Sequence, residues 1–150
     1  MRDFFKRYIP EFVYGAVDGT VTTFAVVAAS AGAGISSSVI LILGIANLIA
    51  DGFSMGSSAY LSASAEHEES VRDTQKRSSP KIIGAVTFLA FVVVGSVPVL
   101  PYLIDVIANL KAPNAVLFYV SSALTAAPFL AIGFIKGKVS KQSPWQSAGI

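Results

Sequence analysis

Four long apolar segments alternate with short polar stretches along the chain. The apolar segments cover about residues 12–33, 38–65, 82–104 and 115–135, and each is long enough to cross a bilayer as a helix, which takes about 20 residues. Charged residues make up only 13% of the chain, about half their share in an average soluble domain. The pattern therefore predicts an all-α, polytopic transmembrane bundle that forms a single membrane domain.

Positive charges are concentrated in alternate loops. Ten of the eleven Lys and Arg residues precede the first segment, lie between the second and third segments, or follow the fourth, and only Lys111 lies elsewhere. By the positive-inside rule, the N-terminus and the linker at about residues 66–81 are expected to be cytoplasmic. Because topology explains the net charge of +2, the charge gives no support for a nucleic-acid-binding protein.

The second segment and the polar residues after it are longer than a bilayer requires. One helix over residues 38–69 would be about 48 Å long, whereas the hydrocarbon core is about 30 Å thick. We therefore expect this helix to project into the cytoplasm. Pro80 permits a new helix start, and Pro98, Pro101 and Pro128 predict kinks or a span end whose freed carbonyls need other partners.

Asp18 and Asp51 are the two ionisable side chains within these four segments. A charge in the bilayer costs about 2.5–3.5 kcal/mol, so such a side chain normally faces a partner or a water-filled path. Both aspartates are therefore candidates for a functional site. Alternatively, each aspartate pairs with or caps a helix, or stays protonated.

Helical spacing places polar neighbours beside both aspartates, because residues four apart share a helix face. Two rows result: Tyr14, Asp18 and Thr22 in the first segment, and Asn47, Asp51 and Met55 in the second. Counting inward from the expected cytoplasmic ends of the spans puts Asp18 and Met55 at similar depth, with Asp51 and Asn47 deeper. The two rows would then face one path.

The side chains in these rows suit a divalent metal ion. Carboxylate, amide and hydroxyl oxygens bind hard ions, and a thioether favours transition metals. Asp18 and Met55 are therefore candidate ligands for Fe(II), Mn(II) or a related ion, although Met55 could simply fill space. Further candidate ligands follow the second segment: Glu66, His67 and Glu69, with Glu68 between them. For these residues a solvated helix end is the favoured interpretation.

Both aspartate-bearing stretches also carry a GxxxG pattern, formed by Gly15 and Gly19 and by Gly52 and Gly56. Small residues at this spacing let membrane helices approach closely. Closely packed helices with a few polar groups between them predict a narrow permeation path rather than a large ligand cavity. The chain has no cysteine and no HExxH, GxSxG or phosphate-binding glycine motif, so it is predicted not to be an enzyme.

The stretches YGAVDGTVTTFAVVA (14–28) and ADGFSMGSSAYLSASAE (50–66) resemble the vacuolar iron transporter family. The resemblance implies a transporter that moves iron(II), manganese(II) or both out of the cytoplasm in exchange for protons. It also implies a homodimer with five membrane helices per subunit and an ion path along the dimer interface.

The resemblance assigns roles to individual residues. Asp18 and Met55 match the family's pathway aspartate and methionine, and Gly52 and Gly56 match its close-packing glycines. Asn47 stands where eukaryotic members often carry glutamate. The metal ion is then the transported substrate, and no cofactor is expected to be bound permanently.

Two features depart from the family pattern. Eukaryotic members carry a long cytoplasmic metal-binding domain between the second and third spans, whereas a short linker occupies that place here. A fifth span is expected to begin at about residue 145 and to be cut short. The expected location is the cell membrane in a prokaryote or the vacuolar membrane in a eukaryote. A cation channel and a non-transporting membrane interaction subunit stay open as alternatives.

Overall fold

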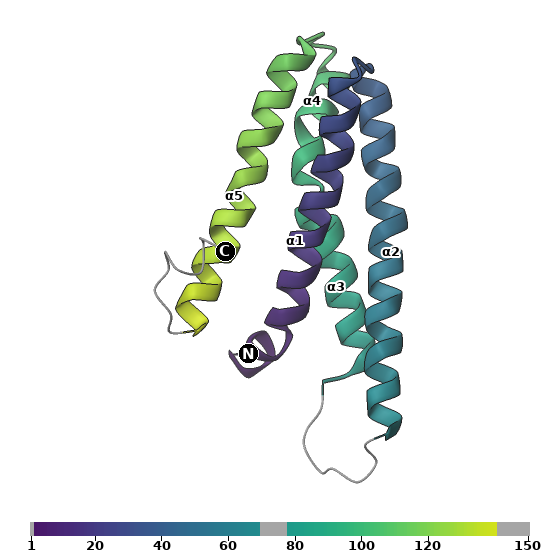
Figure 1. Ribbon diagram of the computed structural model, residues 1–150, viewed down its shortest axis with the longest axis vertical. Helices are drawn as coiled ribbons and strands as arrows, with labels where there is room; N and C mark the ends of the chain where they lie inside the picture. The colour runs from purple at the N-terminus through teal and green to yellow at the C-terminus, as the bar shows by residue number, and fades with distance from the viewer. Residues whose placement is uncertain (1, 70–77, 141–150) are drawn as a thin grey trace.

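The computed structural model describes residues 2–69 and 78–140, and every element within them is helical (Figure 1). In chain order the elements are α1 (Arg2–Gly32), α2 (Ser37–Glu69), α3 (Pro80–Gly95), the 3-10 helix η1 (Val97–Val99), α4 (Leu100–Ala108) and α5 (Asn114–Ser140). Four stretches of the described residues are long and apolar enough to cross a membrane: Arg7–Gly32, Ser37–Glu66, Pro80–Ala108 and Asn114–Ala131. The predicted all-α fold with four readable spans is confirmed.

A short turn joins α1 to α2 and makes them antiparallel neighbours. Gly34 has a φ of +71°, a left-handed conformation that commonly ends a helix and suits glycine. The amide of Gly34 donates to the carbonyl of Ala31 at 3.0 Å, and the amide of Ile35 donates to that of Ser30 at 3.1 Å. Because the turn spans only residues 33–36, it fixes which turns of the two helices lie side by side.

The third span is broken where its prolines lie. Helix α3 ends at Gly95, Pro98 lies in η1, and Pro101 lies in the first turn of α4. The hydroxyl of Ser121 on α5 donates to the carbonyl of Pro98 at 2.7 Å, which gives a buried acceptor at the break a partner. A neighbouring helix thus supplies the hydrogen-bond donor that a free backbone carbonyl within a membrane requires.

Helix α2 is the longest element, with 33 residues and so a length of about 50 Å. It extends past the start of α3 at the lower end of the molecule (Figure 1), as its length in the sequence predicts. Pro80 is the first residue of α3, a position where proline is tolerated. Pro128 lies inside α5, which continues through it.

Helix α3 packs against both α1 and α2 and brings its backbone into contact with theirs. A Cβ added at Gly19 would lie 2.9 Å from the Cα of Phe91, and one added at Gly95 would lie 2.8 Å from the carbonyl carbon of Gly19. A Cβ added at Gly56 would lie 3.0 Å from the carbonyl oxygen of Gly84. Real Cβ atoms do not approach so closely, so the helices can make these contacts only because glycine has no side chain.

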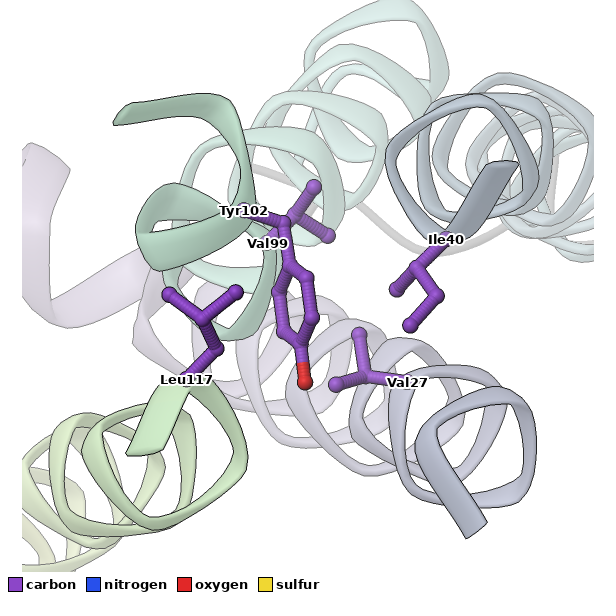
Figure 2. Packing of buried hydrophobic residues seen from close by; sticks show 5 residues of the cluster. All are labelled: Val27, Ile40, Val99, Tyr102 and Leu117. Atoms are coloured by element: carbon purple, nitrogen blue, oxygen red, sulfur yellow. The ribbon is translucent and has the colours of Figure 1, made fainter. Parts of the chain in front are cut away.

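A hydrophobic cluster at the upper end of the bundle joins α1, α2, η1, α4 and α5 (Figure 2). Its buried members are Val27 from α1, Ile40 from α2, Val99 from η1, Tyr102 from α4 and Leu117 from α5. Figure 2 shows the Tyr102 ring between Leu117 and Val27. The cluster holds the upper ends of the helices together, on the far side of the mid-span aspartates from the N-terminus.

Candidate functional site

The two aspartates lie beside the glycines that contact α3 but point elsewhere. Asp18 precedes Gly19, and Asp51 precedes Gly52. Consecutive residues of a helix are rotated by about 100°, so neither aspartate occupies the glycine face. Both aspartates are partly buried, and each lies near the middle of its membrane span. The same two helices thus present a glycine face to α3 and a polar face to each other.

The deepest polar contact between α1 and α2 is made by Asn47. Its amide nitrogen donates to the hydroxyl of Thr23 at 3.1 Å, and lies 3.5 Å from that of Thr22. The Thr22 hydroxyl in turn donates to the carbonyl of Asp18 at 2.9 Å. These bonds tie the two helices together one turn beyond Asp18, on the side nearer the 33–36 turn.

One turn closer to the N-terminus, Asp18 and Asp51 form the next level. The two carboxyl groups are close enough for the charge of Asp51 to act on Asp18. Their positions follow from the hairpin, because Asp18 lies fourteen residues before Gly32 and Asp51 fourteen residues after Ser37. The two carboxyl groups therefore lie at the same level of the bundle, at mid-span.

Below the carboxylates, Tyr14 and Met55 share an open hollow of about 390 Å³. The other residues that line it are small and mostly polar: Ser54, Ser58, Ala59 and Ser62. Tyr14 is 66% exposed. The two predicted rows thus meet in antiparallel order as three levels. We call this polar surface the α1–α2 groove, although only its lowest level lines the hollow.

The order of depth differs from the expectation at one point. Counting from the far ends of the spans puts Met55 level with Asp18, whereas Asp51 is opposite Asp18 and Met55 lies one turn lower, beside Tyr14. The far ends are poor reference points because α2 continues beyond α1 and α3. Asp51 therefore belongs to the same level as Asp18.

The acidic stretch at the end of α2 stands apart from this groove. Glu66 is exposed, and the side chains of His67, Glu68 and Glu69 lie outside the part of the chain whose side chains are described. Within the described residues, no group of three or more His, Asp and Glu side chains is arranged to hold a metal ion. The candidate ligands that the structure brings together are those of the groove.

Sequence reasoning missed two further acidic residues within the spans, because the helices extend beyond the predicted segments. Glu11 lies in the span that begins at Arg7, and its Oε2 is buried without a hydrogen-bond partner. Its position seven residues before Asp18, on the same helix face, was the available signal. Asp105 is 6% exposed and its Oδ1 accepts a bond of 2.9 Å from the amide of Ala112, so it braces the loop after α4.

The groove offers a divalent cation two carboxylates with amide and hydroxyl oxygens one turn above them and a thioether one turn below. Hard oxygen donors suit Mn(II) and Fe(II), and a single thioether adds a preference for transition metals without the tight hold of thiolates. Two carboxylates alone leave coordination positions open. Such a site can take up an ion and release it again.

The match to a protein family model, described as the VIT family, covers nearly the whole chain. It falls in two segments, residues 9–80 and 67–149. The two segments overlap over residues 67–80, where the linker between α2 and α3 lies.

Each of three curated relatives matches between 41% and 50% of the chain. A "Vacuolar iron transporter" of Toxoplasma gondii is 48% identical over 61 residues, which are 41% of this chain and 20% of that protein. One of Plasmodium berghei is 34% identical over 71 residues, 47% of this chain and 26% of the relative. "Vacuolar iron transporter 1" of Arabidopsis thaliana is 36% identical over 75 residues, 50% of this chain and 30% of the relative.

The aligned region thus spans less than a third of these relatives' own length. The family consists of transport proteins rather than enzymes, in agreement with the sequence-based prediction. Together with four apolar helices of spanning length, the match identifies a multi-pass membrane protein. The chain belongs to the VIT family.

Proposed function

We propose that this chain transports divalent transition-metal ions, iron(II), manganese(II) or both, out of the cytoplasm in exchange for protons. The observation that carries the proposal is the Asp18–Asp51 pair, which lies at one level of the α1–α2 hairpin, at mid-span. The names of the relatives, which are vacuolar iron transporters, support iron as a substrate.

The carboxylate pair accounts for exchange between metal and protons. Two neighbouring carboxylates repel each other when both are ionised, and either a divalent cation or bound protons relieves the repulsion. Because a metal binds the deprotonated form, metal and protons compete for the same oxygens. An ion that leaves the pair is thus replaced by protons, which couples the two movements.

The three levels of the groove define a route. An ion enters at the open hollow, where Met55 and Tyr14 lie, and then reaches Asp18 and Asp51. Asn47 and Thr22 lie one turn further on, toward the 33–36 turn. With the N-terminus in the cytoplasm, as the loop charges indicate, this direction leads outward.

A second copy of the chain is proposed to complete the path. Beside the groove, α1 exposes Tyr14 and Val21, which are 66% and 47% accessible, and Asp18 is only partly buried. A carboxylate at this depth is costly in contact with lipid. A homodimer that buries this face of α1 would place the ion between two subunits, in the cell membrane of a prokaryote or the vacuolar membrane of a eukaryote.

The test is uptake of Fe(II) or Mn(II) into proteoliposomes that carry the purified chain under an imposed pH gradient. We expect uptake that depends on the gradient and is lost with Asp18→Asn and with Asp51→Asn. Asp105→Asn is the matched control, because this buried carboxylate lies outside the groove and asparagine keeps the Oδ1 acceptor for Ala112.

The alternatives give different outcomes in the same assay. A cation channel passes the ion without the pH gradient. A non-transporting membrane subunit shows no uptake. It also shows no thermal stabilisation by metal, because only a ligand that binds the folded state stabilises it. Full uptake by Asp18→Asn would exclude the proposed role of the pair.

A further inference from the structure

Helices α2 and α3 border an open, mostly apolar groove at the lower end of the bundle, where the two helices lie side by side (Figure 1). The groove has a volume of about 490 Å³ and lies between residues 53–61 of α2 and residues 81–88 of α3. We call it the α2–α3 groove. Among the described residues that line it, Lys81 is the one charged residue, and the large side chains are Phe53, Tyr60, Leu61 and Phe88.

Two glycines form the floor of the α2–α3 groove. A Cβ added at Gly84 would lie 2.7 Å from the carbonyl oxygen of Gly56, and one added at Gly56 would lie 2.8 Å from the Cβ of Phe88. The helices therefore touch through main-chain atoms at this point. The side chains of Phe53 and Leu61 are 69% and 63% exposed, so they stand out beside the glycines. The groove is thus part of the α2–α3 contact itself.

The α2–α3 groove is separate from the proposed ion path. Met55 lines the hollow of the α1–α2 groove, whereas Phe53 and Ser57 line the α2–α3 groove. Each of these two residues lies two positions from Met55, which is about 200° around the helix axis. Among the described residues, none lines both hollows. The two therefore lie on opposite sides of α2.

The groove runs inward from the end of the third span. Lys81 is the second residue of α3, where this span begins, and Phe88 lies about 10 Å further along the helix. Half of the hydrocarbon core is about 15 Å thick, so the apolar part of the groove lies within one leaflet. Tyr60 packs beside Gly84, near the lysine end, and tyrosine is typical of the membrane–water interface.

From this arrangement we infer that the α2–α3 groove binds a phospholipid with an anionic headgroup. One acyl chain lies against Phe53 and Phe88, and the headgroup lies at the Lys81 ammonium. Charge complementarity identifies this occupant, because an apolar groove that ends in a cation matches an apolar tail with an anionic head. Basic pockets between membrane helices on the cytoplasmic side bind such headgroups, and the loop charges put Lys81 on that side. The inference does not depend on the proposed transport function.

Tryptophan fluorescence in vesicles tests the site in the full chain. The sequence has one tryptophan, Trp145, so Phe53→Trp in a Trp145→Phe background provides a single reporter. The vesicles mix phosphatidylcholine with phosphatidylglycerol, and one lipid at a time carries bromine on its acyl chains, which quenches a tryptophan in contact with it. We expect phosphatidylglycerol to be favoured at the Phe53→Trp reporter by about fivefold, the effect of about one basic residue near an anionic membrane surface.

Leu130→Trp in the same background is the matched control reporter. Leu130 lies sixteen residues after the start of α5 and Phe53 sixteen residues after the start of α2, and both side chains are 69% exposed. Leu130 lies outside the groove. We expect Lys81→Gln to reduce the preference at Phe53→Trp to near one and to leave the preference at Leu130→Trp unchanged. Lys111→Gln, at an exposed lysine in the loop after α4, should change neither.

A second variant tests whether the groove is needed in addition to the lysine. Ala85 lines the groove and is exposed, so Ala85→Leu fills part of the groove without entering a buried contact. We expect the preference at Phe53→Trp to fall toward one although Lys81 is still present. Ala123→Leu, at an exposed position of α5, is the matched control and should leave the preference as it is.

Each contrary result overturns the inference at a different step. Equal affinities of the two lipids at Phe53→Trp would reject a site for anionic lipid. A preference that survives Lys81→Gln would reject the ammonium as the headgroup contact, and one that survives Ala85→Leu would reject the groove as the binding surface. Weak quenching by both lipids at Phe53→Trp, with normal quenching at Leu130→Trp, would mean that a protein segment such as a second copy of the chain covers the groove.

Discussion

The glycine face and the polar face of the α1–α2 pair are built from neighbouring residues but pack in different ways. On the glycine face, Gly19 and Gly56 bring main-chain atoms of α3 into contact, and no room is left for a methyl group. On the polar face, side chains meet through hydrogen bonds and charge, with an open hollow at one end. The glycine face therefore sets how closely α1 and α2 pack against α3, and the polar face holds polar groups at mid-span.

The largest expected effect is a loss of stability on the glycine face. Gly19→Ala should lower the free energy of unfolding by about 1–3 kcal/mol, because the new methyl group overpacks against the backbone of Phe91. Denaturant unfolding in detergent micelles measures the change. Gly32→Ala is the matched control, since nothing lies within 4 Å of a Cβ added there. Equal stability of the two variants would contradict the proposed difference between the faces.

On the polar face, removing one carboxylate should leave the fold intact and weaken metal binding. We expect Asp18→Asn and Asp51→Asn each to lower the affinity for Mn(II) by at least about tenfold, the loss that even indirect partners of a metal typically cause. Because the two carboxylates act as one site, the double variant should lose much less than the sum of the two effects. A normal affinity in Asp51→Asn would show that Asp51 only packs against α1.

Acidity should reduce metal binding at the polar face. Protons compete with the ion for the carboxylate oxygens, so stabilisation by Mn(II) should fall as the pH is lowered. Thermal unfolding with and without Mn(II) over a series of pH values measures this dependence. The slope should flatten in Asp51→Asn, which removes one of the competing sites. A pH dependence identical to that of the native chain would assign the effect to groups outside the pair.

The smallest expected effect concerns the hydrogen bond from Asn47 to Thr23. Such bonds between membrane helices contribute on average about 0.6 kcal/mol in double-mutant cycles, so Asn47→Ala and Thr23→Ala should show a coupling of this size. Thr20 supplies the control, because its hydroxyl donates to Ala16 within α1 at 2.7 Å. A cycle between Asn47 and Thr20 should give a coupling near zero, and equal couplings would show that the bond contributes nothing specific.

Much of the fold could be predicted from the sequence because bilayer thickness limits it so strongly. Apolar length defined four spans, Pro80 marked the start of α3, and the later prolines marked the break before α4. The membership of the two polar rows also followed from helical spacing alone. What spacing could not supply was the partner of each glycine: both GxxxG patterns meet α3, and a single helix does not reveal which neighbour its small residues face.

The relative height of Asp18, Asp51 and Met55 was predictable in principle, but from a different reference point. Span ends are uncertain because helices can continue into water, as α2 does. The short turn at residues 33–36 is a firmer reference, since equal counts outward from it place Asp18 opposite Asp51. The packing of Phe91 against Gly19 could not be predicted, because it is a tertiary contact of a residue that is apolar like its neighbours.

The shortness of the turn at residues 33–36 has a consequence for how this chain can change length. One residue inserted between Ser37 and Asn47 would rotate every later side chain of α2 by about 100° and shift it by about 1.5 Å, which would take Asp51 off the groove. A deletion between Thr22 and Gly32 would displace Asp18 in the same way. Insertions between α2 and α3 change neither the number of residues from Asp18 to the turn nor the number from the turn to Asp51. Natural and engineered variants should therefore keep the first two spans at constant length and vary freely at the linker.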